Sequence, residues 1–393
     1  MQQDLAGYFH QLSQLLVHYR QYWQLLPFQH QVLPWAGQAW QAPLAALTPA
    51  GLDQAEQSSQ LPSWLAPHFA ALFQLVSPLE QAPAAELSAL PFWLQTGISG
   101  RKLEQIDALC QQWLPATLPV LEWCAGKGHL GRILAQRFGQ PVTSVEWQPQ
   151  LCDEGAALAE QHQLEQQFIC ADVLSEPLTG VLKPAQHLVA LHACGDLHIR
   201  LLQQAVQHGC RQLQLVPCCY HLIADELYQP LSALAQQHNL RLGKDDLKLV
   251  VQGQVTGGAR VNRLRHTEVL WRLAYDELRA DISGQRAYQP LSSVAKHWFS
   301  GDFAGFAHWA AHQHQLTLPA SVDWPAYLAR GAQRQLLVRR IELVRHLFRR
   351  PLELWLALDK ALYLQQHGYQ VRLTQLCQPS ITPRNILLSA RKA

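Results

Sequence analysis

Residues 120–130, VLEWCAGKGHL, decide the fold. A short apolar strand with an acid near its end runs into a turn with Gly126 and Gly128, and helical periodicity follows. Glycine at these two positions lets the backbone pass close to a ligand, because a Cβ atom would collide. The start of the helix adds unpaired N–H donors. The stretch therefore predicts the ligand-binding turn of a Rossmann-like sheet.

The alternation of strand and helix continues on both sides of this turn. The expected helices lie at 129–138, 151–162 and 196–208. The expected strands lie at 119–123, 142–147, 167–173, 187–193 and 213–219. Strands that alternate with helices predict an α/β fold with a parallel sheet covered on both faces. A helix over 351–369 and strands over 370–376 and 385–390 fit the end of a seven-stranded class I methyltransferase sheet.

The turn differs from the dinucleotide pattern G-x-G-x-x-G, because Cys124 stands where the first glycine is often found. Glu122 suits a ligand with a cationic amino group better than a diphosphate, and S-adenosyl-L-methionine (SAM) has such a group. Glu146, at the end of the second strand, is placed to accept both ribose hydroxyls. Asp172, at the end of the third strand, is placed to accept from the adenine amino group. A generic Rossmann turn with surface acids is the alternative.

These arguments predict SAM as the cofactor. The residues expected to bind it are Glu122, Cys124, Ala125, Gly126, Gly128, His129, Glu146, Trp147, Asp172, Val173 and His192.

The fourth and fifth strands end in cysteine and histidine, within LHACGD (191–196) and PCCYH (217–221). Because neighbouring strand ends face the ligand crevice, we expect these side chains to cluster. In one interpretation they form the pocket, with the histidine and cysteine of the fourth strand beside the cofactor. The candidates for orienting or deprotonating the methyl acceptor are then His192, Asp196, Cys219, Tyr220 and His221.

Three further interpretations of these cysteines stay open. In the first, one thiolate is a nucleophile, as in RNA cytosine-5 methyltransferases, which carry cysteines at the same two strand ends. Zinc binding is another, since H-x-C and C-C-x-H supply soft ligands. Adjacent Cys218 and Cys219 should point to opposite sides of a strand, however, so no metal is expected. In the last interpretation, the cysteines are simply buried thiols.

Four segments carry a family resemblance. They are EWCAGKGHLGRILA (122–135), LHACGDL (191–197), VPCCYH (216–221) and DKALYLQQHGY with SITPRNILLSA (359–390). Together they resemble one group of class I SAM-dependent methyltransferases, over about 97–221 and 350–390. The group includes methyltransferase-like proteins labelled ribosomal RNA adenine dimethylase domain-containing and the glutathione S-transferase C-terminal domain-containing protein.

The resemblance implies the fold, the SAM cofactor and an enzyme of the methyltransferase class (EC 2.1.1.-). It does not imply adenine as the acceptor. Adenine dimethylases carry an Asn/Asp-Pro-Pro-aromatic signature where this chain has His-Ala-Cys-Gly-Asp. RNA is the preferred acceptor and protein the second. A non-catalytic SAM-fold module that binds RNA or the ribosome is the rival from another class.

We expect three segments of organisation: a helical N-terminal unit over 1–96, a methyltransferase domain over 97–221 with 350–393, and a mainly helical insertion over 222–349. Within the insertion, helices are expected at 225–238, 268–279 and 335–349. The aromatic stripes at 297–299 and 303–309 are expected to be core.

Seven arginines crowd one region, at 330, 334, 339, 340, 345, 349 and 350. They are either an RNA-binding edge or a solvated helix face paired with acids. Arg384 and Asn385, before the last strand, belong to a structural turn or reach the acceptor.

The composition of the chain excludes several classes of protein. The chain has 393 residues, 48% hydrophobic, with a net charge of +2, which excludes wholesale disorder and a polycationic nucleic-acid coat. Nine cysteines do not fit a disulfide framework. The N-terminus lacks signal-peptide features, and no apolar stretch approaches the ~20 residues of a membrane span. We therefore expect a cytoplasmic protein that makes no membrane contact; the sequence does not predict its oligomeric state.

Overall fold

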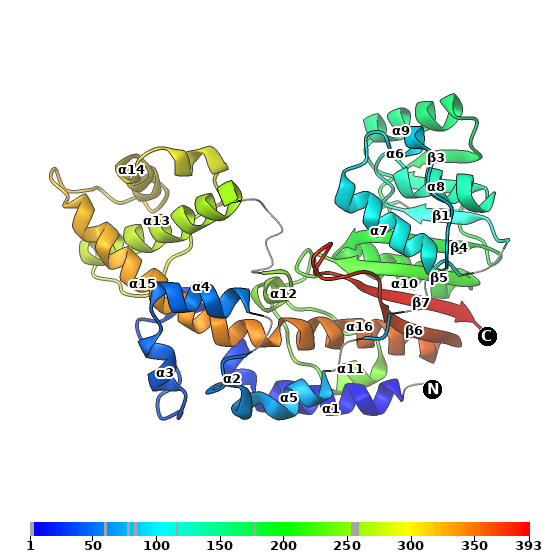
Figure 1. Ribbon diagram of the computed structural model, residues 1–393. Helices are drawn as coiled ribbons and strands as arrows, with labels where there is room; N and C mark the ends of the chain where they lie inside the picture. Colours follow the sequence, from blue (N-terminus) through cyan, green and yellow to red (C-terminus); the bar gives the residue numbers. More distant parts are fainter. Residues whose placement is uncertain are drawn as a thin grey trace. The chain divides into compact units, whose positions relative to one another are not determined.

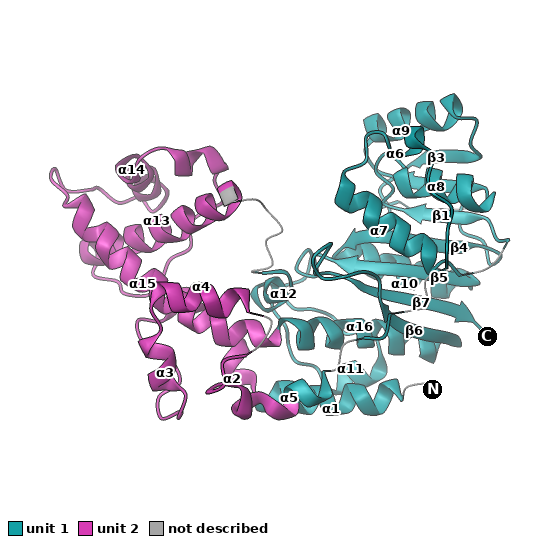
Figure 2. Ribbon diagram, in the orientation of Figure 1, with its two compact units in different colours: residues 1–18, 72–254, 349–393 teal, residues 19–71, 255–348 magenta. Residues whose placement is uncertain are grey.

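The computed structural model describes residues 4–58, 61–76, 79–81, 85–114, 117–176, 178, 180–252 and 259–393 (Figure 1). The chain forms two compact units (Figure 2). Unit 1 contains residues 1–18, 72–254 and 349–393, and unit 2 contains residues 19–71 and 255–348.

Unit 1 is built on a seven-stranded sheet with the strand order β3-β2-β1-β4-β5-β7-β6. Its strands are β1 (Val120–Trp123), β2 (Val142–Glu146), β3 (Gln166–Cys170), β4 (His187–Cys194), β5 (Gln212–Cys218), β6 (Tyr369–Gln375) and β7 (Ile386–Lys392). The first five strands are parallel, and β7 runs antiparallel to both β5 and β6. The predicted Rossmann-like class I methyltransferase sheet, with its C-terminal strand pair, is confirmed.

Helices cover both faces of this sheet (Figure 1). α7 (Gly100–Gln111), α8 (His129–Phe138) and α9 (Pro149–Gln161) lie on one side, and α10 (Asp196–His208) and α16 (Arg349–Gln366) lie on the other. Every residue of β1 and β5 is buried, as a parallel sheet covered on both faces requires. On the α7–α8 side, Ile106, Leu130 and Ile133 pack with Val120 in one hydrophobic cluster.

The first helix of the chain also belongs to unit 1. α1 (Leu5–His18) lies along α16, where the ring centroids of Phe9 and Trp355 are 5.2 Å apart. The Trp355 indole donates to Ser13 Oγ at 2.9 Å. The other helices of unit 1 are α6 (Phe92–Gln95), α11 (Ala233–Gln237) and α12 (Lys244–Val251).

The division of the chain therefore differs from the predicted segments 1–96, 97–221 with 350–393, and 222–349. The physical reason is that α1 buries its apolar face against a helix far away in the sequence. Residues 19–71, in turn, cluster with residues 255–348 rather than with α1.

Unit 2 is helical. Its elements are α2 (Arg20–Trp23), η1 (Pro27–Gln29), α3 (Gln41–Ala46), α4 (Pro49–Gln57), η2 (Ala66–Phe69), the start of α5 (Ala70–Leu75), α13 (Ala259–Ser283), η3 (Lys296–Ser300), α14 (Phe303–Gln313), α15 (Trp324–Arg345) and η4 (His346–Phe348). Phe299, Phe303 and Phe306 are buried with Trp271, which confirms that the aromatic stripes contribute to a core.

The arginines of α15 are bound within unit 2. The buried Arg334 forms ion pairs with Asp276 at 2.6 Å and Glu277 at 3.0 Å. Arg345, also buried, donates to the backbone oxygen of Trp23 at 3.0 Å. Further ion pairs join Arg330 to Glu277 and Asp281, and Arg339 to Asp53 and Glu56. Pairing with acids is therefore the interpretation that the structure supports, with much of the pairing inside the unit rather than on a solvated face.

One predicted helix of the insertion is wrong over its first half. Of the segment 225–238, only Ala233–Gln237 is helical. The Asp359 carboxylate of α16 accepts hydrogen bonds from the Leu231 and Ser232 amides at 2.9 and 2.7 Å. These bonds engage the backbone amides just before α11, and Pro230 lacks the N–H that a helix would need.

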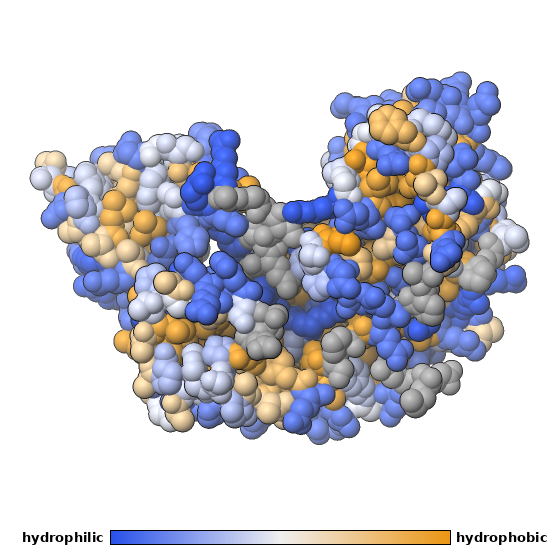
Figure 3. Space-filling model, viewed as in Figure 1, coloured by the Kyte–Doolittle hydropathy of each residue, from blue (hydrophilic) through white to orange (hydrophobic). Residues whose placement is uncertain are grey.

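Exposed large hydrophobic side chains gather at α6 in unit 1. Phe92 is 85% exposed, and the Trp93 ring stacks on His162 with centroids 4.2 Å apart. Figure 3 shows hydrophobic residues over this part of unit 1 among mostly hydrophilic ones. Among the described residues, no helix combines the length and apolarity needed to cross a bilayer.

Candidate functional site

β1 leads into a tight loop whose backbone is left-handed at three positions. φ is 55° at Cys124, 58° at Gly126 and 64° at Gly128, the residue before α8. A Cβ atom on Gly128 would lie 2.4 Å from side-chain atoms of both Gln166 and Phe168, so the turn requires glycine. The Ala125 amide donates to the Val145 oxygen at 3.0 Å and ties the loop to β2.

A cavity of about 290 Å³ lies at this loop and the ends of β2 and β3. The predicted cofactor residues that line it are Cys124, Gly126, Glu146, Trp147, Asp172 and Val173. The lining residues that were not predicted are Val145, Gln148, Leu151, Ala171 and Leu197. Four of these are close sequence neighbours of the predicted strand ends, and that proximity was the available signal. The position is the one where open parallel sheets bind ligands, at the carboxyl ends of the strands.

Glu146 joins the glycine loop to the tip of β2. Its Oε2 accepts from the Gly126 amide at 2.9 Å, and its Oε1 accepts from the Gln148 amide at 3.2 Å. Each carboxylate oxygen keeps a second lone pair, so Glu146 can still accept from two vicinal hydroxyls. Because both oxygens are held, the carboxylate is preorganised for such a ligand.

Asp172 also lines this cavity. The Leu174 amide donates to its Oδ1 at 3.0 Å, and the Ser175 hydroxyl donates to its Oδ2 at 2.8 Å. These hydrogen bonds favour the ionised form and lower the pKa of Asp172. The residue is therefore an acceptor at neutral pH, as a contact with an amino group requires.

Glu122 does not line this cavity, in contrast to the prediction that it grips a cationic amino group there. Its Oε2 accepts from the Ser144 hydroxyl at 2.7 Å and lies 2.5 Å from where a Cβ of Gly131 would stand, beneath α8. Burial raises the pKa of Glu122 to about 7. The physical reason is that this residue lies within β1, before the strand end, and faces the helix layer.

Ala125, Gly128 and His129 do not line the cavity either. Ala125 and Gly128 shape the loop through their backbones. His129 Nδ1 faces an Arg132 guanidinium nitrogen at 2.6 Å, and burial, aided by the Arg132 charge, lowers the pKa of His129 to about 4.

His192 lies at an irregularity near the end of β4, outside the lining of the cavity. Its φ is 67°, and the pairing of β4 with β5 shifts register between Leu191 and Ala193. Its Nε2 donates to the Gln105 side-chain oxygen, a partner from α7 that no sequence signal marked. Burial lowers the pKa of His192 to about 4, so the imidazole is neutral near pH 7 and is a weak base.

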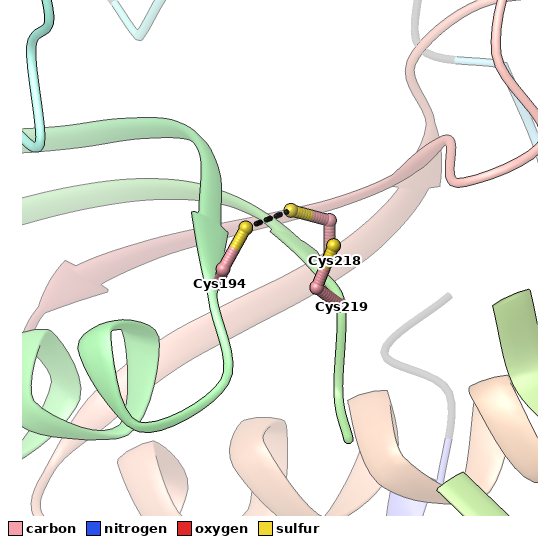
Figure 4. Close-up of side chains that lie close together, drawn as sticks. All are labelled: Cys194, Cys218 and Cys219. Carbon is pink, nitrogen blue, oxygen red and sulfur yellow. Dashed lines mark hydrogen bonds between the residues drawn. The ribbon is translucent and has the colours of Figure 1, made fainter. Parts of the chain in front are cut away.

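Three thiols meet at the ends of β4 and β5 (Figure 4). The Sγ atoms of Cys194 and Cys218 are 3.1 Å apart, and those of Cys194, Cys218 and Cys219 all lie within 4.8 Å of one another. The prediction that Cys218 and Cys219 point to opposite sides is therefore wrong. Cys219 has a φ of 44°, and this left-handed conformation breaks the alternation of a strand. Hydrogen bonds from the other two thiols, with the Arg384 charge, lower the pKa of Cys219.

Asp196 positions the loop that follows β5. Its Oδ2 accepts from the Ala224 amide at 2.7 Å, and its own amide donates to the Leu222 oxygen at 3.0 Å. A Cβ atom on Gly195 would lie 1.7 Å from that oxygen, so glycine is required there.

Tyr220 and His221, the other acceptor candidates, differ in burial. Tyr220 is buried, with Lys360 Nζ of α16 5.2 Å from its ring centroid. Burial raises the pKa of Tyr220 well above its ordinary value. His221 is partly exposed, and partial burial lowers its pKa.

Arg384 lies in the turn before β7, and its positive charge acts on His192 and Cys219. It contributes to lowering the pKa of both His192 and Cys219. Asn385, in contrast, is buried and donates to the Cys377 oxygen at 2.7 Å, so the structural interpretation applies to it. Arg384 is thus the member of this predicted pair that belongs with the candidate acceptor side.

A family model described as a methyltransferase domain matches residues 101–226, from α7 to the loop after β5. This match agrees with the seven-stranded sheet of the predicted class I methyltransferase fold, and it supports the prediction of SAM as the cofactor.

Solved methyltransferase structures are similar to parts of the chain. A TehB-like SAM-dependent methyltransferase from Corynebacterium glutamicum is 13% identical, with 28% of this chain and 60% of that chain covered and a TM-score of 0.24. A SAM-dependent methyltransferase from Aquifex aeolicus is 14% identical, with 33% and 72% covered and a TM-score of 0.26. The glycopeptide N-methyltransferase MtfA complexed with SAM is 16% identical, with 30% and 55% covered and a TM-score of 0.25. The chain spans less than two thirds of two of these structures, and likeness at this level carries no conclusion about the acceptor.

Proposed function

We propose that this protein is an enzyme that transfers a methyl group from SAM to RNA. The observation that carries the proposal is the cavity at the glycine loop, with Glu146 and Asp172 on its walls. In the proposed complex, Glu146 accepts the ribose hydroxyls and Asp172 accepts the adenine amino group. Trp147, Val173 and Leu151 supply apolar surface for the base.

The acceptor side of the proposed site is the end of β4 and β5. His192 is neutral near pH 7 and is the candidate base. In the reaction the acceptor nucleophile forms a bond to the methyl carbon, and the carbon–sulfur bond breaks with its electron pair staying on sulfur. The products are the methylated acceptor, S-adenosylhomocysteine and a proton that the base receives. Holding the reactants in line contributes most of the acceleration in such a transfer, up to ~7–11 kcal/mol.

RNA is favoured over protein as the acceptor by the cation at this end of the sheet. Arg384 lies within electrostatic reach of His192 and Cys219, and guanidinium groups suit phosphate contacts. The arginines of α15 are not used in this proposal, because acids and backbone oxygens of unit 2 bind them.

A cysteine-nucleophile mechanism is the second candidate, favoured by the lowered pKa of Cys219. In that mechanism the Cys219 thiolate adds to a pyrimidine ring before methyl transfer and is later eliminated. Replacing Cys219 by alanine would then abolish transfer and leave SAM affinity unchanged.

Transfer of labelled methyl from SAM to fractionated cell extract tests the main proposal. We expect label that RNase removes and protease does not, and Glu146→Gln and Asp172→Asn should lose it. Glu160→Gln, an exposed acid on α9, is the control and should keep it. Label that protease alone removes would overturn the RNA acceptor, and SAM binding without transfer to any fraction would favour the binding module. We also propose a cytoplasmic location, where nine thiols stay reduced, and cell fractionation tests it.

A further inference from the structure

The three thiols at the ends of β4 and β5 are arranged as a set of metal ligands. Cys194 and Cys218 are register partners on adjacent parallel strands, so their side chains leave the sheet side by side. Cys219 follows directly, and its sulfur turns back toward the same space (Figure 4). All three Sγ atoms lie within 4.8 Å of one another.

The sulfur of Cys219 joins the other two because the backbone of Cys219 adopts an unfavourable conformation. A positive φ is unfavourable for any residue other than glycine, and such strain clusters at functional sites. Cys219, with a φ of 44°, adopts it at the residue where continued strand geometry would have sent its thiol to the other face. Cys219 also begins the turn after β5, where its backbone oxygen accepts from the Leu222 amide at 2.9 Å, so one conformation serves both this turn and the thiol cluster.

The sulfur spacing fits coordination better than a disulfide. A disulfide holds its sulfurs at about 2.05 Å, and Cys194 and Cys218 are 3.1 Å apart. Tetrahedral zinc, with zinc–sulfur bonds of about 2.3 Å, places two thiolates about 3.8 Å apart. The Cys194–Cys218 separation of 3.1 Å and the limit of 4.8 Å on all three pairs put the sulfurs within a small adjustment of that value.

We propose that Cys194, Cys218 and Cys219 bind one Zn²⁺ ion, with the fourth position left to a ligand from outside the chain. Binding releases the thiol protons and leaves a site with one net negative charge. Arg384, whose charge acts on both Cys194 and Cys219, offsets it. Three protein ligands with an open position are the arrangement of catalytic rather than structural zinc sites. The proposal does not depend on the acceptor being RNA or on the transfer reaction, because metal content is its readout.

The first experiment measures zinc in the full-length protein, purified without added metal or chelator from zinc-supplemented cells. We expect close to one zinc per chain by mass spectrometry of the metal. Cys194→Ser, Cys218→Ser and Cys219→Ser should each lose most of it. Cys170→Ser, at an exposed cysteine outside the cluster, is the matched control and should retain it.

The second experiment uses wild-type protein, so its result does not depend on whether the variants fold. Wild-type protein stripped with chelator is titrated with Co²⁺ alone, which absorbs in the near ultraviolet when thiolates bind it. We expect a band that saturates at one equivalent and disappears when Zn²⁺ is added.

Three results would overturn the proposal. The first is a protein without zinc that gives no cobalt band. The second is zinc content that survives all three cluster substitutions, which would be an adventitious ion only. The third is a Cys194–Cys218 disulfide, which would leave the denatured, metal-free protein with seven reactive thiols of nine and would appear as one joined peptide pair in a non-reducing digest.

Discussion

The Gly126 amide donates to Glu146 Oε2 at 2.9 Å, so the loop after β1 and the tip of β2 form one rigid wall of the cavity. Glu146→Gln keeps the shape of this side chain but replaces one acceptor oxygen with a donor. Since hydrogen bonds to a charged group contribute about 1.5–3 kcal/mol, we expect SAM affinity to fall at least about tenfold. Titration calorimetry measures it, with Glu160→Gln as the control. Unchanged affinity would mean that Glu146 does not touch the cofactor.

The Gly195 backbone should tolerate no side chain. Its φ is 53°, and a Cβ atom would lie 1.7 Å from the Leu222 oxygen, so Gly195→Ala must displace the loop that Asp196 holds. We expect the free energy of unfolding to fall by about 3 kcal/mol or more. Gly139→Ala is the matched control, because Gly139 also has a positive φ, of 59°, but has open space around it. The free energy of unfolding of that variant, measured with urea, should fall by only about 1–2 kcal/mol. Equal losses in the two variants would contradict the clash.

Glu122 makes the stability of unit 1 depend on pH. Its pKa is raised from an ordinary 4.5 to about 7, because burial disfavours the charged form. A group whose pKa is higher in the folded state stabilises the fold below its unfolded pKa and loses that contribution as pH rises through the folded pKa. Stability from Glu122 is therefore complete near pH 4 and lost between about pH 4.5 and 7, by up to about 3 kcal/mol.

The Glu122→Gln variant removes this ionisation and retains a hydrogen-bonding side chain beside Ser144. Its free energy of unfolding should fall less between pH 5 and pH 8 than that of the wild type. Chemical unfolding at the two pH values, without cofactor, measures the difference. An identical pH dependence in variant and wild type would show that Glu122 is not protonated in the fold.

Arg334 should matter for stability and not for RNA affinity. Arg334→Met retains the aliphatic volume but leaves the buried Asp276 and Glu277 with less compensation. We expect a loss of about 3 kcal/mol in the unfolding of unit 2, as for a buried pair that loses one partner. Arg286→Ala, at an exposed ion pair with Asp281, should cost less than about 1 kcal/mol. A stable Arg334→Met protein with weakened RNA binding would restore the RNA-edge interpretation.

The sequence predicted the sheet well because its signals are local. β1, the glycine turn and α8 lie within 120–138, and each is marked by a change of periodicity or by glycine. Glu146 and Asp172 were placed at strand ends, so the sequence indicated where the cavity that we propose for the cofactor lies, without knowledge of tertiary contacts.

The sequence did not predict the direction of certain side chains, nor contacts between residues that are far apart along the chain. Glu122 was assigned to the ligand by its position in β1, but its side chain faces α8. The sequence predicted that these strand-end cysteines cluster, but the left-handed conformation of Cys219 has no glycine to indicate it, so Cys219 was expected to point away from Cys218. The packing of α1 on α16 joins residues as distant as Ser13 and Trp355, and no local pattern reports such a contact.

The strand order has a consequence for how the nascent protein matures. β7 follows β6 in the chain but is seated between β6 and β5. Until the ribosome has released Ile386–Lys392, β5 presents an unpaired edge of backbone amides and carbonyls. Such an edge is a template for pairing with other chains, so the partly synthesised polypeptide is vulnerable to aggregation until β7 pairs with β5.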